Sequence, residues 1–182
     1  MTKKVIILSG SARPGSVADK VMPLVDAEVA SRDSLEAVSI DVNTLNLPFF
    51  NAPIAPSAEG YVATDENVKK WAESVASADA VILVTPEYNA SMSAIQKNAL
   101  DWLYAEWVDK SVALVGYGWH SGERAHVNAR AILDNVKANV LEPTTTLGFM
   151  KDLNPDGTVL NQETVSHQLK ETVDALVEAI SE

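Results

Sequence analysis

A polar segment near the N-terminus, Ser9-Gly10-Ser11-Ala12-Arg13-Pro14-Gly15-Ser16, has the composition of an anion site. Its glycines let the backbone approach a ligand closely, its serines add hydroxyl donors, and its arginine supplies positive charge. The segment lacks both the Gly-Lys-Ser/Thr ending of a Walker A loop and the Gly-x-Gly-x-x-Gly pattern. A polar turn capped by Ser16 explains the same residues, so this segment alone predicts either a phosphate site or a turn.

A second polar segment, Thr85-Pro86-Glu87-Tyr88-Asn89, follows the apolar run Ala80 to Val84. Pro86 has a fixed φ and no N–H, so we expect the strand to end there and the backbone to turn outward. The free N–H and C=O groups of such a turn would suit the edge of a flat heteroaromatic ring, with Tyr88 packed against it. The alternative is a solvated turn in which Asn89 or Ser91 caps the next helix.

A third segment, Gly116-Tyr117-Gly118-Trp119-His120-Ser121-Gly122, combines glycines with two large aromatic residues. Glycines allow close approach of the backbone, and aromatic rings can flank a flat cofactor. Trp119 suits a place in the core or at a subunit contact equally well.

Other catalytic chemistries find little support in the sequence. There is no Gly-x-Ser-x-Gly elbow, and we expect His120, His126 and His167 to be surface residues rather than members of a hydrolytic triad. Glu123 and His126 have the spacing of a helical metal-binding pair, but a surface pair on a helix is the favoured explanation. The absence of cysteine excludes thiolate chemistry, so any redox activity requires an organic cofactor or a metal without thiolate ligands.

The elements that would position these segments alternate along the chain. Apolar periodicity predicts strands at 5–8, 38–42, 80–84, 112–115 and 144–149, and helices near 17–29, 68–75, 92–103, 129–136 and 165–180. This alternation is typical of an α/β fold with a five-stranded parallel sheet and helices on both faces. In such sheets ligands bind at the carboxyl ends of the strands, which is where all three polar segments fall. The irregular stretch 43–61 is expected to form a loop over the surface or over a site.

Length and charge narrow the function further. A chain of 182 residues predicts one domain, residues 1–182. With 14 Lys and Arg against 25 Asp and Glu, its formal charge of -11 argues against a nucleic-acid partner. No apolar run reaches the roughly 20 residues that span a membrane. The start MTKKVIILSG lacks the pattern of a signal peptide, so we expect a cytoplasmic protein.

Taken in order along the chain, GSARPGS, TPEYNASMSAIQKNALDW and GYGWHSG resemble the NAD(P)H-dependent FMN reductase family. That family includes quinone, chromate and azo-dye reductases with a flavodoxin-like three-layer fold. The resemblance implies that one group of residues binds the FMN phosphate: Ser11, Arg13, Gly15, Ser16 and the amide of Val17. It implies that a second group borders the isoalloxazine: Pro86, Glu87, Tyr88 and Asn89. A third group would approach its pyrimidine side: Gly116, Tyr117 and Gly118.

The resemblance also implies an activity. NAD(P)H would pass hydride to FMN, and the reduced flavin would reduce a small acceptor, such as a quinone, free flavin, an azo compound or chromate. No side chain need act as an acid or base in this transfer. A homodimer or homotetramer is implied, with the helix after the second segment at the interface. An electron carrier and an FMN-binding regulatory module on the same fold remain alternatives.

The chain departs from the family pattern at three positions. The family often has Asn, Pro and Leu where this sequence has Ala18, Ser93 and Gln96. Ala18 lacks one potential phosphate contact, so its effect would be on the affinity for FMN.

Overall fold

The computed structural model describes residues 2–181, which alternate between strands and helices. The strands are β1 (Lys3–Ser9), β2 (Leu35–Asp41), β3 (Ala80–Pro86), β4 (Ser111–Gly118), β5 (Asn139–Val140) and β6 (Thr145–Gly148). The helices are α1 (Ala18–Ala30), the 3-10 helix η1 (Val42–Leu45), α2 (Glu66–Ser77), α3 (Ala94–Asp101), α4 (Glu123–Asn135) and α5 (Gln162–Ile180).

All strand pairs in the sheet are parallel, and the order β2-β1-β3-β4-β5 is that of a flavodoxin-like fold. The fifth position is shared by two short strands, because β5 pairs with the start of β4 and β6 with its end. The single strand predicted at 144–149 corresponds to β6, and the sequence signal for β5 was too short to detect. The order reverses between β1 and β3, the point at which such sheets bind ligands.

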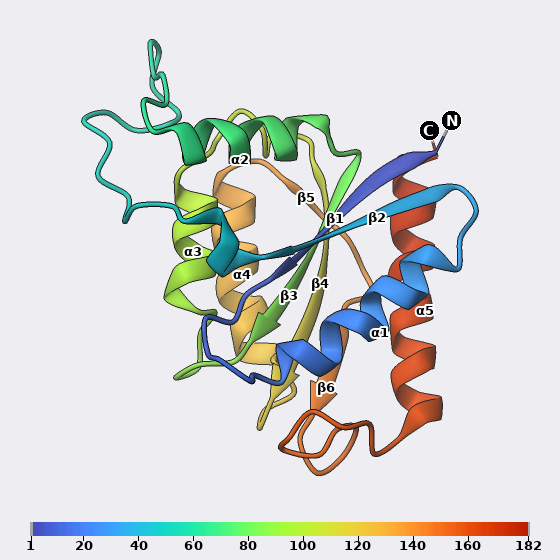
Figure 1. Cartoon of the computed structure of the whole chain (residues 1–182). Coiled ribbons are helices and arrows are strands. Elements are labelled where there is room, and N and C mark those ends of the chain that lie inside the picture. The colour runs from blue at the N-terminus through green and yellow to red at the C-terminus, as the bar shows by residue number, and fades with distance from the viewer. Residues whose placement is uncertain (1, 182) are drawn as a thin grey trace.

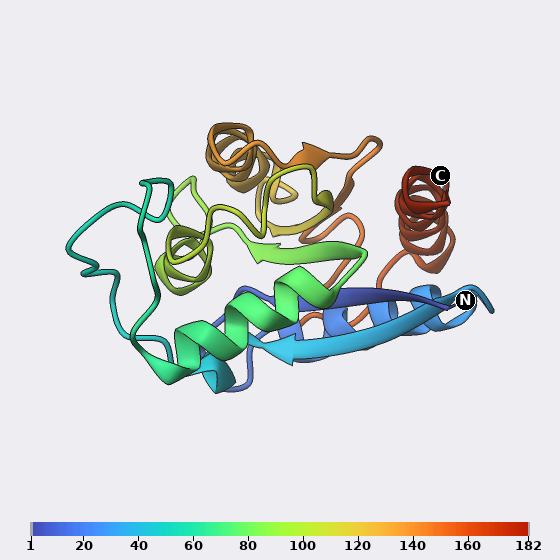
Figure 2. The same ribbon diagram turned by 90° about the horizontal axis from the view of Figure 1, so that it is seen from above.

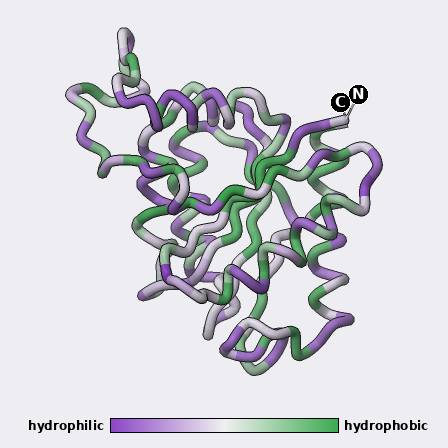
Figure 3. The backbone as a smooth tube through the Cα atoms, in the orientation of Figure 1, coloured by the Kyte–Doolittle hydropathy of each residue, from purple (hydrophilic) through white to green (hydrophobic). Residues whose placement is uncertain are grey.

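Helices cover both faces of the sheet, as the alternation predicted (Figure 1; Figure 2). Helices α2, α3 and α4 enclose one core with Ile6, Leu83 and Leu114, and helices α1 and α5 enclose the other with Ile7 and Val84. The central strands are apolar along most of their length (Figure 3). Because β1, β3 and β4 are buried on both faces, they appear in the sequence as continuous apolar runs rather than as alternating patterns.

The strands that lead into the three polar segments extend further than the apolar runs indicated. Strand β3 runs beyond the apolar run to Pro86, which pairs with Tyr117, and it ends at Pro86 as predicted. Proline is tolerated there because β1 has already ended at Ser9 and no ladder partner remains on that side for the missing N–H. Strand β4 likewise continues through Gly118, so the first part of the third segment is strand rather than loop.

Helix α3 begins later than expected. Its N-cap is Ser93, whose Oγ accepts a hydrogen bond from the Gln96 amide at 3.2 Å, so neither Asn89 nor Ser91 caps it. Asn89 and Ala90 instead have left-handed backbone conformations, with φ of 50° and 63°. A wide turn therefore separates β3 from α3.

The stretch after η1 projects from the body of the fold beside α2 and α3 (Figure 1). Phe49 there is 80% exposed. Within the part of the chain that the structure describes, no helix combines the length and the apolar character needed to cross a bilayer.

Candidate active site

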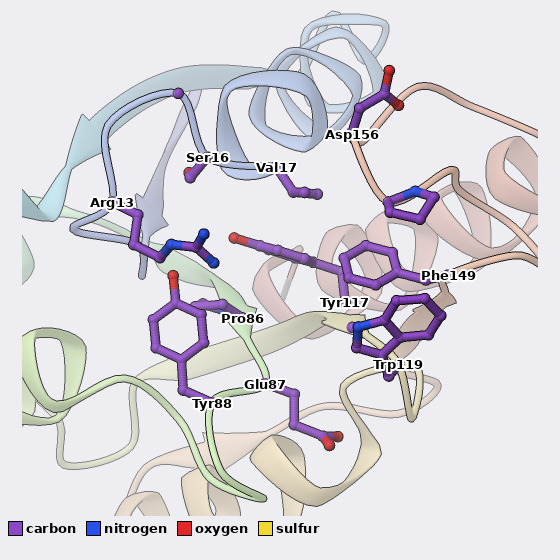
Figure 4. A pocket seen from close by; sticks show the side chains of 13 residues that line it. Arg13, Ser16, Val17, Pro86, Glu87, Tyr88, Tyr117, Trp119, Phe149 and Asp156 are labelled. Carbon is purple, nitrogen blue, oxygen red and sulfur yellow. The ribbon is translucent and has the colours of Figure 1, made fainter.

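A pocket of about 360 Å³ lies at the carboxyl ends of β1, β3, β4 and β6 (Figure 4). Nine of the sequence-predicted residues line it: Arg13, Gly15, Ser16, Val17, Pro86, Glu87, Tyr88, Tyr117 and Gly118. Ser11, Asn89 and Gly116 do not line it, and neither does any residue of 43–61. The three polar segments, separated by up to a hundred residues in sequence, therefore meet at one site, as the rule for parallel sheets predicted.

One end of the pocket is built for an anion. The guanidinium of Arg13 extends into it between Ser16 and Tyr88 (Figure 4), and Arg13 forms no salt bridge with any described residue. The amides of Gly15, Ser16 and Val17 precede α1 and donate no hydrogen bond to other described residues. Free amides at a helix N-terminus attract anions, and the adjacent arginine adds a full charge.

Ser16 lines this end of the pocket. Its Oγ accepts a hydrogen bond from the Ala18 amide at 3.1 Å, which turns the chain into α1 although the helix proper begins at Ala18. Ser11, by contrast, does not line this pocket, and its hydroxyl is 2.8 Å from that of Tyr88. Ser11 thus orients Tyr88 rather than lining the pocket.

The hydroxyl of Tyr117 is the strongest indication of a polar ligand. The residue is only 4% exposed, and its oxygen is buried without a well-formed hydrogen bond to any described residue, although the Ser11 hydroxyl lies nearby. It points toward Arg13 (Figure 4). Burial raises the pKa of this phenol, so it stays protonated and can donate. Unpaired buried hydroxyls are costly, so this one fits a ligand that accepts hydrogen bonds.

The turn after β3 leaves fewer backbone N–H groups free for a ligand than predicted. The Glu87 amide donates to the Tyr117 carbonyl at 3.0 Å, and the Tyr88 amide donates to the Ser91 carbonyl at 2.9 Å. The amides of Asn89 and Ala90 remain without a partner among the described residues. The Glu87 side chain points away from the pocket toward Arg124, whose Nε donates to its carboxylate at 2.7 Å (Figure 4).

The opposite end of the pocket is aromatic. Trp119 is 67% exposed and meets Phe149 edge to face, with ring centroids 5.5 Å apart. Phe149, Pro155 and Asp156 line the pocket but were not predicted as site residues. Their position in the sequence could have identified them, because residues 149–156 follow the strand beside β4. In addition, Asn154-Pro155-Asp156-Gly157 is a turn sequence.

Gly116 lies below the pocket floor next to His126. The prediction that His126 is a surface residue was wrong. His126 is only 4% exposed, so it is a core residue rather than a surface one. A Cβ at Gly116 would lie 2.5 Å from its Nε2, which shows how closely the imidazole covers that glycine. Burial and the nearby Arg130 lower the pKa of His126 to about 4. Among residues 2–181 no cluster of three or more metal-binding side chains occurs, so Glu123 and His126 have no third ligand.

The arrangement has one end for an anion and another for a flat ring, and the described residues that line it include no acid–base dyad. These features match FMN, a flat heteroaromatic ring joined to a phosphate, and the unpaired Tyr117 hydroxyl provides a donor for its polar chain. Such a site binds and orients a cofactor, and the cofactor carries the chemistry.

Comparison with known proteins identifies flavin-dependent reductases as relatives of this chain. The profile of the family described as NADPH-dependent FMN reductase matches residues 3–152. An NAD(P)H-dependent FMN reductase from Nectria sp is 33% identical over 148 residues, covering 79% of this chain and 74% of that protein. A quinone reductase from Escherichia coli is 30% identical over 178 residues, covering 90% of this chain and 88% of that protein.

Among solved structures, the flavoenzyme NAD(P)H:(acceptor) oxidoreductase FerB from Paracoccus denitrificans superposes with a TM-score of 0.77 at 26% identity. That match covers 98% of this chain and 97% of FerB. Since the family profile spans most of the sheet and all three polar segments, the chain belongs to the NADPH-dependent FMN reductase family.

Proposed function

We propose that this oxidoreductase binds FMN in the pocket, accepts hydride from NAD(P)H, and reduces a small planar acceptor such as a quinone. The observation that carries the proposal is the buried, unpaired Tyr117 hydroxyl directed at Arg13, next to three free amides. FMN, when bound, supplies the ability to take up hydride and to release electrons to an acceptor.

The residues of the chain would bind and orient the cofactor. Arg13 and the amides of Gly15, Ser16 and Val17 would bind the phosphate, with Tyr117 donating beside them. The carboxyl ends of β3 and β4 would lie along the ring, with Pro86, Tyr88 and Gly118 as its neighbours. The free amides of Asn89 and Ala90 would stabilise negative charge that develops at the ring edge. Ser11 and Gly116 would support this site from behind.

The exposed rim of the aromatic end, outside the part of the pocket that the FMN ring would fill, supports a planar acceptor. Trp119 exposes most of its ring at the rim, and Phe149 holds it from one side. Aromatic faces favour stacking with other flat rings, so a quinone suits this rim better than a tetrahedral oxyanion such as chromate.

We further propose a homodimer formed through the stretch after η1. Phe49, Phe50 and Ile54 are exposed there, and Phe49 and Phe50 border a groove with Lys97 and Asn98 of α3. Exposed apolar patches of this kind mark contact surfaces. Residues 1–182 would form one domain of this dimer in the cytoplasm, where NAD(P)H is regenerated. Light scattering on the native chain and on Phe49→Glu tests the dimer, because the variant is expected to be a monomer.

The decisive test is an anaerobic absorption spectrum of the protein reconstituted with FMN, recorded after addition of NADPH and, separately, of NADH. Bleaching of the flavin band establishes the reductase and its preferred donor. A bound flavin that neither donor bleaches indicates an electron carrier, and failure to bind FMN overturns the assignment of the pocket.

A further inference from the structure

Three residues stand side by side in adjacent strands just below the pocket floor. Ser9 pairs with Val84, so the next residue, Gly10, lies beside Thr85, and Thr85 pairs with Gly116. All three are on the face covered by α3 and α4, because the residues two positions earlier belong to that core: Leu8, Leu83 and Leu114. This row therefore consists of a threonine between two glycines.

The glycines make room for two polar side chains from the helices. A Cβ at Gly10 would lie 2.4 Å from Oε1 of Gln96, which comes from α3. A Cβ at Gly116 would lie 2.5 Å from Nε2 of His126, which comes from α4. An amide and an imidazole thus occupy the positions that side chains would take on either side of Thr85.

Each of the three polar side chains has a buried atom without a partner. Gln96 and Thr85 are fully buried and His126 is 4% exposed. Oε1 of Gln96, Oγ1 of Thr85 and Nε2 of His126 make no hydrogen bond to other described atoms. Leaving three buried polar atoms without hydrogen bonds would be costly, and such atoms are nearly always paired with protein or with ordered water.

Their spacing and chemistry suggest how they pair. Neighbouring strands lie about 4.8 Å apart, so each helix-borne group is roughly one strand spacing from the Thr85 side chain, which suits a bridging water. Oε1 is only an acceptor, whereas neutral Nε2 accepts when the ring proton is on Nδ1 and donates when the proton is on Nε2. With the proton on Nδ1, Thr85 has one proton for two acceptors, and the row then takes its further donors from internal water.

We propose that Gln96, Thr85 and His126 form one hydrogen-bonded row, closed by internal water, that positions the backbone of the pocket floor. Two residues of the row directly precede residues that line the pocket, because Thr85 precedes Pro86 and Gly116 precedes Tyr117. The third, Gly10, follows the end of β1 and precedes Ser11, whose hydroxyl contacts that of Tyr88. Spreading of β1, β3 and β4 at this level would misplace all three polar segments together. The row requires neutral His126, near which lie Arg130 and the Glu87 carboxylate that pairs with Arg124.

Thr85→Val tests the row, because it removes the hydroxyl at nearly constant volume. The direction in which the melting temperature changes shows whether this hydroxyl is hydrogen-bonded. In a hydrogen-bonded row, Gln96 and His126 lose a partner, so the melting temperature falls by about 3 °C or more. If Thr85 is unpaired, the variant melts at the same or a higher temperature, which overturns the proposal. Thr172→Val is the matched control, since Thr172 is a buried threonine of the other core that lies 2.8 Å from the Thr145 hydroxyl.

A positioning role predicts more than lost stability. Thr85→Val should weaken FMN binding about five-fold, Thr85→Ser should restore it, and Thr172→Val should leave it unchanged. Equal FMN affinity in Thr85→Val and the native chain would remove the positioning role.

The water is tested in a high-resolution crystal structure of the native protein. Density within hydrogen-bond distance of Thr85 Oγ1 and of Gln96 or His126 supports the row, and dry contact among the three overturns it.

Discussion

The carboxylate of Glu87 accepts hydrogen bonds from the side chain and the backbone amide of Arg124, with Nε at 2.7 Å and the amide at 3.3 Å. The Glu87 side chain is 3% exposed, whereas that of Arg124 is 48% exposed. The turn after β3 thereby caps the N-terminus of α4, and Asn128 adds a bond to the Ala90 carbonyl at 3.1 Å. Two of the three site segments are therefore fixed to each other.

Loss of this pair should destabilise the protein through the buried partner. Arg124→Gln leaves the Glu87 carboxylate buried without its counter-charge, so we expect the free energy of unfolding to fall by about 1–3 kcal/mol. Lys69→Gln is the control: its pair with Glu66 is an exposed i,i+3 pair, and its loss should cost less than about 1 kcal/mol. Urea denaturation measures both variants, and equal effects would contradict a special role for Glu87.

Arg13→Ala should weaken FMN binding by about 1.5–3 kcal/mol, roughly 10- to 150-fold, because one charged partner of the phosphate is lost. Titration of the apoprotein followed by flavin fluorescence measures the dissociation constant. Arg32→Ala provides a comparison, since Arg32 lies beyond the opposite end of α1 and pairs with Glu28 and Asp174. An unchanged affinity in folded Arg13→Ala would exclude Arg13 from the phosphate site.

Trp119→Ala should raise the KM for a naphthoquinone roughly five- to ten-fold through loss of a stacking surface. Trp119→Phe should recover most of the effect, because it keeps a ring at the rim. Hexacyanoferrate(III), which has no ring to stack, should be reduced at the native rate by both variants. If both acceptors lose rate together, or if the affinity for FMN falls, Trp119 contacts the cofactor rather than the acceptor.

Stability should depend on pH through His126. Its pKa lies near 4 in the folded protein, against 6.5 for a solvated histidine side chain, so between these values the unfolded chain binds more protons. This stabilisation is complete above pH 6.5 and is lost as the pH falls to about 4, by at most about 3 kcal/mol. Subtracting the profile of His126→Gln from that of the native chain isolates the contribution. A flat difference over this interval would show that His126 is accessible to protonation in the fold.

The sequence specified the strands most clearly where both faces are buried. Strands β1, β3 and β4 were recognised from continuous apolar runs, and the parallel arrangement followed from the alternation with helices. The strand ends were predicted less well. Whether a residue such as Pro86 or Gly118 still pairs depends on where the neighbouring strand ends, which local sequence does not contain.

For the site, the sequence by itself determined which segments meet, because carboxyl ends of parallel strands lie at one edge of the sheet. Only the tertiary structure decided the roles of individual side chains. Tyr117 and Gly116 are adjacent in β4 yet face opposite sides, so one enters the pocket and the other meets His126. Phe149 reaches Trp119 only because β6 pairs with β4. Such contacts depend on strand register and helix packing between residues far apart in sequence, and these long-range relations are settled by the fold as a whole.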